Sequence, residues 1–140
     1  MVDNLYSLVE VVLGSSLLLW GMALVIHVKS AQAVVDFIVN DETSFTLTYI
    51  MAAVFLSWGL AIIWIHNEWV FDFPVIVTLI GWLWTIKCFL WLVIPGPLRK
   101  GLKILYPILK NHWFLRGYGA FIAVLGALII FSYVNGGSLL

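Results

Sequence analysis

The sequence predicts an all-α integral membrane protein: a bundle of four transmembrane helices with two short amphipathic helices at the membrane interface. Hydrophobic residues make up 64% of the 140 positions and charged residues only 10%, whereas a soluble domain carries roughly 25% charged residues. Four apolar runs approach the roughly 20 residues that a helix needs to cross a bilayer. Two shorter segments have the alternation of an amphipathic helix. We therefore treat residues 1–140 as a single integral membrane domain.

The predicted spans lie at about residues 5–28, 45–66, 75–94 and 117–134. The first run is expected to be retained as a span, because Asp3 stands where a signal peptide would carry basic residues. Two of the runs carry small residues at four-residue intervals, namely Ala53, Ser57 and Ala61 in the second and Gly119, Ala123 and Ala127 in the fourth. Small side chains let helices approach closely in lipid, so both stripes are predicted packing seams.

Each pair of spans is separated by a segment that is too polar to cross the membrane. In residues 30–43, the apolar Val34, Phe37 and Ile38 recur at helical spacing, which predicts a helix lying in the interface. After the break at residues 95–97, leucines line one face of the next segment. Its opposite face is basic and carries Arg99, Lys100, Lys103 and Lys110. This pattern is typical of a helix that rests on anionic lipid, so these four side chains are predicted to face lipid.

The two halves of the chain resemble each other. A shift of 67 positions superimposes Gly14 on Gly81, Gly59 on Gly126, Phe37 on Ile104 and Val28 on Pro95. Each half, residues 1–66 and residues 74–140, would be a helical hairpin made of a span, an interfacial helix and a second span. Because each half has an even number of spans, we expect both to have the same orientation, related by an axis along the membrane normal.

The basic residues predict the orientation. Six of the seven Lys and Arg residues lie in residues 29–44 and 95–116. By the positive-inside rule these two connections face the cytoplasm. Both termini and the 66–74 hairpin then face outward, towards a periplasm if the host is Gram-negative. We therefore expect a multi-pass protein of the cell's inner, or cytoplasmic, membrane.

Lys87 is the one basic residue inside a span. A cation near the centre of the bilayer costs on the order of 2.5–3.5 kcal/mol on insertion scales, which makes it a functional candidate. Two structural interpretations compete with a transport role. The lysine stem can snorkel toward the cytoplasmic end, with Trp84 and Trp91 beside the ammonium group at i−3 and i+4. Alternatively, Lys87 pairs with an acid on another subunit.

The outward hairpin carries His66, Glu68 and Asp72, and Glu10 lies near the same side of the membrane. Imidazole and carboxylate groups could bind a divalent transition metal. No second histidine lies on that side, and the hairpin also fits a structural role. In that interpretation His66 caps the partly negative end of the second span, and Asp72 lies at the partly positive start of the third.

Other chemistry is not indicated. The single cysteine, Cys88, excludes an internal disulfide, and neither a phosphate-binding loop, a nucleophile with its base nor a paired-histidine motif is present. The basic residues between 99 and 110 are interpreted as lipid-facing, so nucleic acid is not expected as a partner. We expect no cofactor and no enzymatic activity.

One stretch resembles a known family. His66-Asn67-x-Trp69 is followed by Pro74 to Trp82, which ends in Gly81-Trp82, and then by Ile86-Lys87. This is similar to a family of small bacterial integral membrane proteins whose function is uncharacterised. Cys88 stands where that family's pattern has glycine. The resemblance implies a four-span fold and draws attention to His66, Asn67, Trp69 and Lys87, but it implies no activity.

These observations predict a non-catalytic membrane protein that acts by helix packing, as an accessory subunit of a larger complex or as a homo-oligomer. Its partners would be membrane lipids and other membrane subunits or copies of itself. The alternative is a small channel or carrier for an ion or small solute, with Lys87 and Glu10 on the path. A third hypothesis is an outward metal-binding module at His66.

Overall fold

The computed structural model describes residues 2–42, 44–69, 71 and 74–135, and there the protein is entirely helical. The helices are α1 (Val2–Ile26), α2 (Val28–Asn40), α3 (Ser44–Ile65), α4 (Pro74–Val93), α5 (Pro95–Leu109) and α6 (His112–Val134). Four of them, α1, α3, α4 and α6, are long and apolar enough to cross a membrane. The predicted all-α class is therefore confirmed, and four candidate membrane spans agree with a multi-pass protein.

The membrane-crossing segments are Asn4–Ile26, Ser44–Ile65, Val75–Val93 and His112–Val134. Only the fourth differs much from its predicted bounds, because it begins at His112 and not at 117. The Asn111 side chain accepts a hydrogen bond from the backbone N–H of Trp113 at 2.9 Å, which caps the helix start. This cap allows the polar residues before 117 to join the helix.

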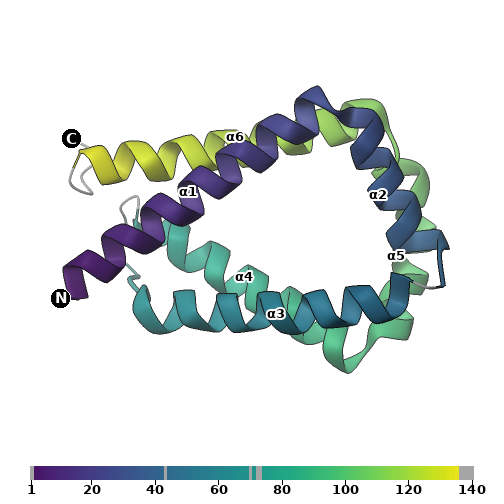
Figure 1. Cartoon of the computed structure of the whole chain (residues 1–140), viewed down its shortest axis with the longest axis horizontal. Coiled ribbons are helices and arrows are strands. Elements are labelled where there is room, and N and C mark those ends of the chain that lie inside the picture. Colours follow the sequence, from purple (N-terminus) through teal and green to yellow (C-terminus); the bar gives the residue numbers. More distant parts are fainter. Residues whose placement is uncertain (1, 43, 70, 72–73, 136–140) are drawn as a thin grey trace.

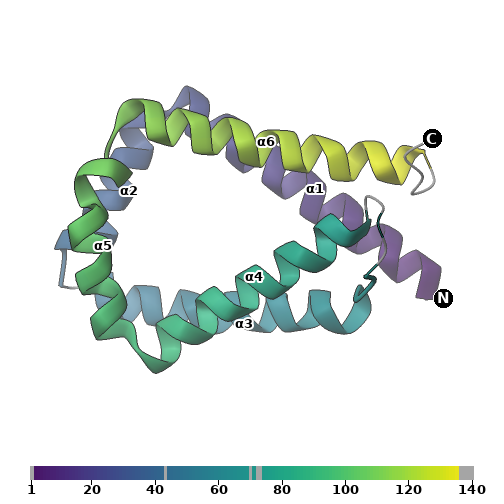
Figure 2. The same cartoon turned by 180° about the vertical axis from the view of Figure 1, so that it is seen from behind.

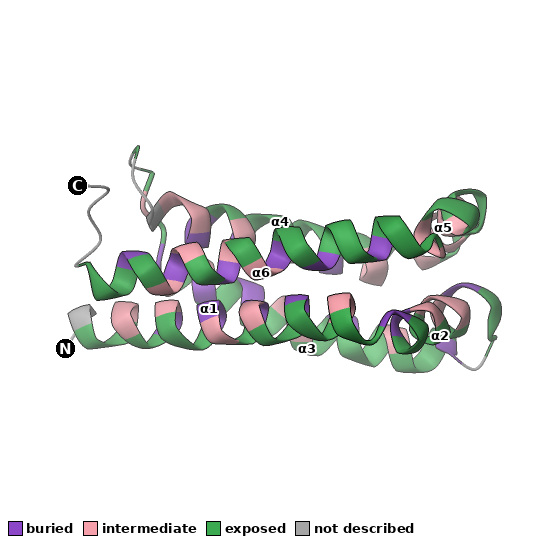
Figure 3. Cartoon of the chain, turned by 90° about the horizontal axis from the view of Figure 1, so that it is seen from above, coloured by how far each residue is buried: buried purple, intermediate pink, exposed green. Residues whose placement is uncertain are grey.

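The helices form two layers (Figure 3), with α1, α2 and α3 in one and α4, α5 and α6 in the other. Across the layers, α1 packs along α6 and α3 packs along α4, while α1 and α3 contact each other little. The start of α1, the end of α6 and the α3–α4 connection lie at one end of the molecule (Figure 1), with α2 and α5 at the other (Figure 2). We call these the hairpin end and the α2/α5 end.

Glycines allow the layers to approach. A Cβ atom on Gly21 would lie 2.4 Å from the backbone N of Ala123, and one on Gly126 would lie 2.5 Å from the backbone N of Leu18. In the other helix pair, a Cβ on Gly59 would lie 2.4 Å from Thr85 Oγ1. Backbones this close leave no room for a side chain, which is the arrangement expected of helices packed in lipid.

Both predicted seams need correction. In α3, Ala53, Ser57 and Ala61 are exposed, and the buried positions are Ala52, Gly59 and Ile62. In α6, Gly119 and Ala123 face α1 as predicted, but Ala127 is exposed and Gly126 takes its place. An α-helix has 3.6 residues per turn, so in α6 the four-residue interval drifts around the helix and Ala127 leaves the contact. In α3 all three small residues lie on the face opposite the buried one.

Two of the joints between a long and a short helix, α1–α2 and α4–α5, consist of a single residue. His27 separates α1 from α2 with φ −106° and ψ 55°, and Ile94 separates α4 from α5 with φ −131° and ψ 57°. The first short helix begins at Val28, two residues before the predicted start of 30. The second contains Pro107 and continues to Leu109. α2 and α5 contact each other.

Candidate functional site

His66 is buried at the hairpin end of the molecule, with 2% of its surface exposed. It follows α3 directly, and its backbone N–H donates to the Ile62 carbonyl at 2.7 Å. Its Nε2 lies 3.3 Å from Oε1 of Glu10 on α1, and its Nδ1 lies 3.3 Å from Oγ1 of Thr78 on α4. The Tyr6 ring meets the imidazole edge-on, with centroids 5.4 Å apart. One imidazole therefore connects three long helices.

Thr78 fixes the chain that follows His66. Its side chain is fully buried, and its Oγ1 accepts a hydrogen bond from the backbone N–H of Glu68 at 3.1 Å. The same hydroxyl lies 3.1 Å from the His66 carbonyl and 3.2 Å from the Glu68 carbonyl, both of which can accept its hydrogen. The hydroxyl thus satisfies backbone groups that have left the helix. The sequence signal for Thr78 was a hydroxyl in the first turns of an apolar run, and Thr85 carries a second hydroxyl farther along the same helix.

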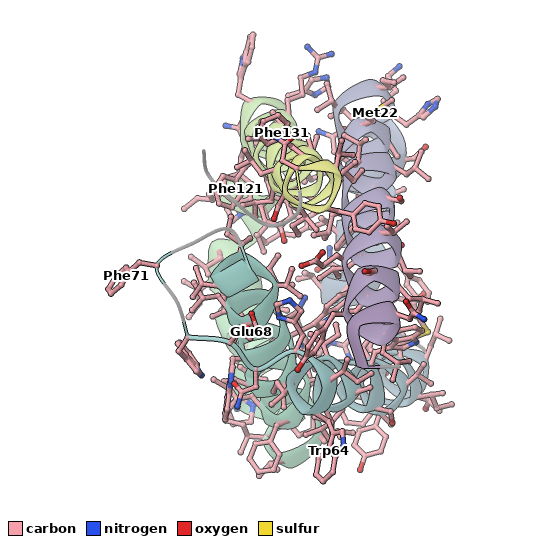
Figure 4. All side chains as sticks on the ribbon, turned by 90° about the vertical axis from the view of Figure 1, so that its left-hand side faces the viewer. Met22, Trp64, Glu68, Phe71, Phe121 and Phe131 are labelled. Carbon is pink, nitrogen blue, oxygen red and sulfur yellow. The ribbon has the colours of Figure 1, made fainter. Side chains whose placement is uncertain are left out.

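Asn67 joins the two tryptophans of the motif. Its Oδ1 accepts from Nε1 of Trp69 at 2.9 Å and lies 3.4 Å from Nε1 of Trp82 on α4. Asn67, Trp69 and Trp82 are all exposed, as expected of amphipathic rings at a membrane interface. Farther along the connection, Phe71 projects away from the helices (Figure 4). Asn67 and Trp69 of the His-Asn-x-Trp motif are therefore connected to Trp82 of the Gly-Trp pair through one acceptor, Asn67 Oδ1.

The alternative interpretations of the hairpin gain no support from the described contacts. Nε2 of His66 approaches Glu10 and Nδ1 approaches Thr78. Because both ring nitrogens are used in this way, the side chain does not cap the carbonyls at the end of α3. Among the described residues, no three His, Cys, Asp or Glu side chains lie close enough to hold a metal ion. Asp72, one of the proposed ligands, lies outside the described residues.

Lys87 lies apart from this network. It is nine residues beyond Thr78 along α4, about 13 Å along the helix axis. Its side chain is exposed on the outer surface of the helix, next to the buried Cys88. The structure therefore does not bring Lys87 and Glu10 together.

The basic residues of α5 divide into two groups. Arg99 donates to the carbonyls of Val39, at 3.4 Å, and Asp41, at the C-terminal end of α2, where a cation is favoured. Lys110 lies 3.1 Å from Oδ2 of Asp36 on α2. Lys100 and Lys103, in contrast, are exposed. Two of the four residues predicted to face lipid thus bind α2.

Tyr106 completes the contact with α2. Its hydroxyl donates to the Asp36 carboxylate and accepts from Lys110 Nζ at 3.0 Å, and Lys110 Nζ also lies 5.4 Å from the centre of the Tyr106 ring. The hydrogen bond from Tyr106, followed by that from Lys110, lowers the pKa of Asp36 below its ordinary value. The bonds to Tyr106 and Asp36 raise the pKa of Lys110.

No match to this chain is found among protein-family models, curated proteins or solved structures. The resemblance at His66-Asn67-x-Trp69 therefore stays a prediction. What can be said about function rests on the geometry of the chain itself.

Chemically, the centre of the candidate site is the Glu10–His66 contact. A carboxyl and an imidazole at hydrogen-bond distance can share, hold and release a proton. Ionisable residues inside membrane bundles mark functional sites by default. This network of Glu10, His66 and Thr78 is hereafter called the hairpin cluster.

Proposed function

We propose that this chain is a non-catalytic integral membrane protein that acts by helix packing, as an accessory subunit of a larger membrane complex or as a homo-oligomer. The observation that carries the proposal is the outer face of α3. Only 17% of its span is buried by the chain itself, and Ala53, Ser57 and Ala61 are exposed on it. Small residues let a second helix approach closely in lipid, where apolar surface alone gives no preference for protein over lipid.

Replacing the small exposed residues of α3 with larger ones tests whether this face packs against another helix. In the full chain, Ala53→Ile together with Ala61→Ile should abolish a larger complex that wild type forms in mild detergent, as judged by native mass spectrometry. Ala120→Ile is the matched control, since Ala120 is exposed on α6. A wild-type chain that is monomeric after extraction from its native membrane contradicts the proposal, and so does a complex that survives the double substitution.

The proposal includes the two like-oriented halves. Equivalent contacts recur 67 positions apart: a Cβ on Gly14 would meet Ile129 and Ile130, and a Cβ on Gly81 would meet Ile62 and Ile63. The approach of Gly126 to Leu18 likewise has its counterpart in that of Gly59 to Thr85. The single-residue joints at His27 and Ile94 are 67 positions apart as well. These equivalences support an internal repeat.

We further propose that the protein lies in the inner membrane with residues 29–44 and 95–116 in the cytoplasm and the termini and the 66–74 hairpin outside. The basic residues of these connections support this orientation. In a Cys88→Ser background, an impermeant thiol reagent added to intact cells should label Phe71→Cys and not Lys100→Cys. Both positions are exposed, so the reverse pattern inverts the orientation.

A second candidate function is a small carrier, and the hairpin cluster favours it. Glu10 and His66 lie between the two helix pairs, and a shallow, open depression of about 460 Å³ lies on the surface at the other end of α1. The depression is lined by Trp20, Ala23, Leu24, His27, Ser30, Ala31 and Val34. Flux of a solute in proteoliposomes should then require Glu10 and His66. If Glu10→Gln and His66→Gln both leave the flux unchanged, the carrier hypothesis fails.

A further inference from the structure

The number of hydrogens available to the hairpin cluster limits how it can be protonated. Thr78 has one hydroxyl hydrogen, and its oxygen already accepts the Glu68 backbone N–H. The His66 and Glu68 carbonyls, 3.1 and 3.2 Å away, can only accept that hydrogen. If Thr78 donates to either carbonyl, its oxygen can face His66 Nδ1, 3.3 Å away, only when Nδ1 carries a proton. The Glu68 N–H, the Nδ1–H and one of the two carbonyls are then satisfied by Thr78.

This assignment determines what lies between His66 and Glu10. With a proton on Nδ1, a neutral ring has a lone pair on Nε2, which can face Glu10 Oε1 at 3.3 Å only if that carboxyl is protonated. The other possibility is an imidazolium that donates from Nε2 to a carboxylate. In both cases the contact contains one proton and the pair has no net charge. Without this proton, the lone pair of His66 Nε2 would face the Glu10 carboxylate, and the two side chains together would carry one negative charge.

Burial favours the neutral pair. His66 is 2% exposed and the Glu10 side chain 13%, and an uncompensated charge held away from water is costly. Among the described residues, the other ionisable groups in contact with the cluster are Tyr6, whose ring meets the imidazole, and Glu68, whose backbone binds Thr78. Neither of them is a cation.

Helix α6 also carries a buried polar side chain, Ser132, near the hairpin end. Ser132 is 2% exposed, and its Oγ has no hydrogen-bond partner among the described residues. α1 and α6 run antiparallel, with Gly14 against Gly126 and Ile129. The register therefore places Ser132 on α6 at the level of Glu10.

We propose that Glu10 and His66 together form a proton-binding site, and that the bound proton joins α1 to His66 and α4 at the hairpin end. Loss of the proton leaves no hydrogen bond between the two side chains. Only apolar contacts, such as those of the cluster that contains Val9, Ile62 and Val77, then join the helix pairs at this end, so their distance there increases while the α2–α5 contact continues to hold the opposite end. This site goes beyond the packing function and does not depend on it, because a chain that forms no larger complex can still bind the proton.

Nitrogen-15 NMR of the histidine-labelled full chain in nanodiscs tests the assignment directly. Comparison with His66→Gln identifies the His66 signals, and His27 and His112, at the α2/α5 end, serve as internal references. We expect Nδ1 of His66 to stay protonated while the proton of the Nε2–Glu10 contact is lost as the pH is raised. A neutral ring with its proton on Nε2 and none on Nδ1 throughout the titration overturns the proposal.

Distance measurements test the mechanical consequence. Spin labels at Leu8 on α1 and Leu79 on α4, both exposed, in a Cys88→Ser background should show a shift to longer distances as the pH is raised. Glu10→Gln should keep the short distance at every pH, because its amide can donate to Nε2 permanently. Glu68→Gln, the matched control, should respond as wild type does. A Glu10→Gln chain that keeps the wild-type response overturns the proposal, as does a wild type that shows none.

Discussion

At the scale of single residues, glycines differ sharply in what surrounds them. A Cβ on Gly21 would lie 2.4 Å from the Ala123 backbone N and 2.5 Å from the Gly119 carbonyl. These atoms belong to α6, so one methyl group must push two helices apart. Around Gly117, in contrast, there is nothing within 4 Å of an added Cβ.

We expect Gly21→Ala to lower the free energy of unfolding by about 1–3 kcal/mol, the usual cost of overpacking. Gly117→Ala should be neutral or slightly stabilising, because alanine favours the helix. Steric trapping in bicelles measures both values. Equal effects of the two substitutions would mean that α1 and α6 are not in close contact at Gly21.

The Thr78 hydroxyl should matter more than its methyl group. Thr78→Val keeps the shape of the side chain but leaves the Glu68 N–H and the His66 nitrogen without their partner. A buried polar group without its partner costs about 1–3 kcal/mol, so stability should fall by that amount. Thr78→Ser retains the hydroxyl, so its free energy of unfolding should fall by less. Steric trapping in bicelles measures both variants. A Thr78→Val chain that is as stable as Thr78→Ser would contradict the network.

The sequence identified residues of the hairpin cluster because a histidine and an acid are rare in apolar runs. It could not pair Glu10 with His66, since that contact depends on the register of α1 against α3 and α4. Lys87 was selected by the same signal and is exposed. Hydropathy indicates how deep a residue lies in a span but not which way it faces.

At the scale of the elements, the α2–α5 contact is held by Asp36, Tyr106 and Lys110. The pKa of Asp36 is lowered, so its contribution to stability is present above its ordinary pKa and is lost as the pH falls through the lower folded value. The pKa of Lys110 is raised, so its contribution is present below the ordinary lysine value and is lost as the pH rises through the higher one. The contact should therefore be complete across the neutral range.

Replacing Asp36 with Asn should loosen α2. We expect faster amide hydrogen exchange in α2 and α5 near neutral pH, while Glu42→Gln, at an exposed position, leaves exchange in both helices unchanged. In wild type, exchange corrected for its intrinsic rate should rise only below the ordinary aspartate pKa of about 3.9 or above the ordinary lysine pKa of about 10.4. The effect is expected to be modest, because the pair is open to solvent.

The amphipathic pattern predicted that two short helices separate the spans, but it did not predict what their basic residues bind. Arg99 and Lys110 were expected to face lipid, and both instead contact α2. A charged face on a helix wheel has the same appearance whether lipid or another helix neutralises it. Only the position of α2 beside α5 distinguishes the two.

At the scale of the whole molecule, the pairing of the long helices can be tested by cross-linking. In a Cys88→Ser background, Phe55→Cys with Trp84→Cys and Leu13→Cys with Ile129→Cys should each form a disulfide. The Phe55 and Trp84 rings stack 5.5 Å apart between α3 and α4, and Leu13 and Ile129 are buried in one cluster between α1 and α6. The crossed combinations, 13 with 55 and 84 with 129, should not cross-link. Cross-linking of position 13 with 55 in preference to 13 with 129 would replace the α1–α6 pairing with one inside the first half.

The number of spans, their approximate bounds and the two short helices followed from hydropathy and periodicity. The pairing of α1 with α6 could not be predicted in this way. Every span is apolar on most of its faces, and lipid does not distinguish one apolar face from another. The glycines that decide the pairing were visible, but a strict four-residue interval selected Ala53 and Ala127 where the contacts use Gly59 and Gly126.

The pairing of α1 with α6 has a consequence for biogenesis. As the ribosome synthesises the chain, four helices are made between α1 and its partner α6, and His66 emerges 56 residues after Glu10. The α3–α4 pair, being adjacent in sequence, can assemble first. Until α6 arrives, the nascent α1 must keep its glycine face against lipid or against the insertion machinery. During the interval between translating α1 and translating α6, α1 therefore lacks the helix with which it makes most of its contacts.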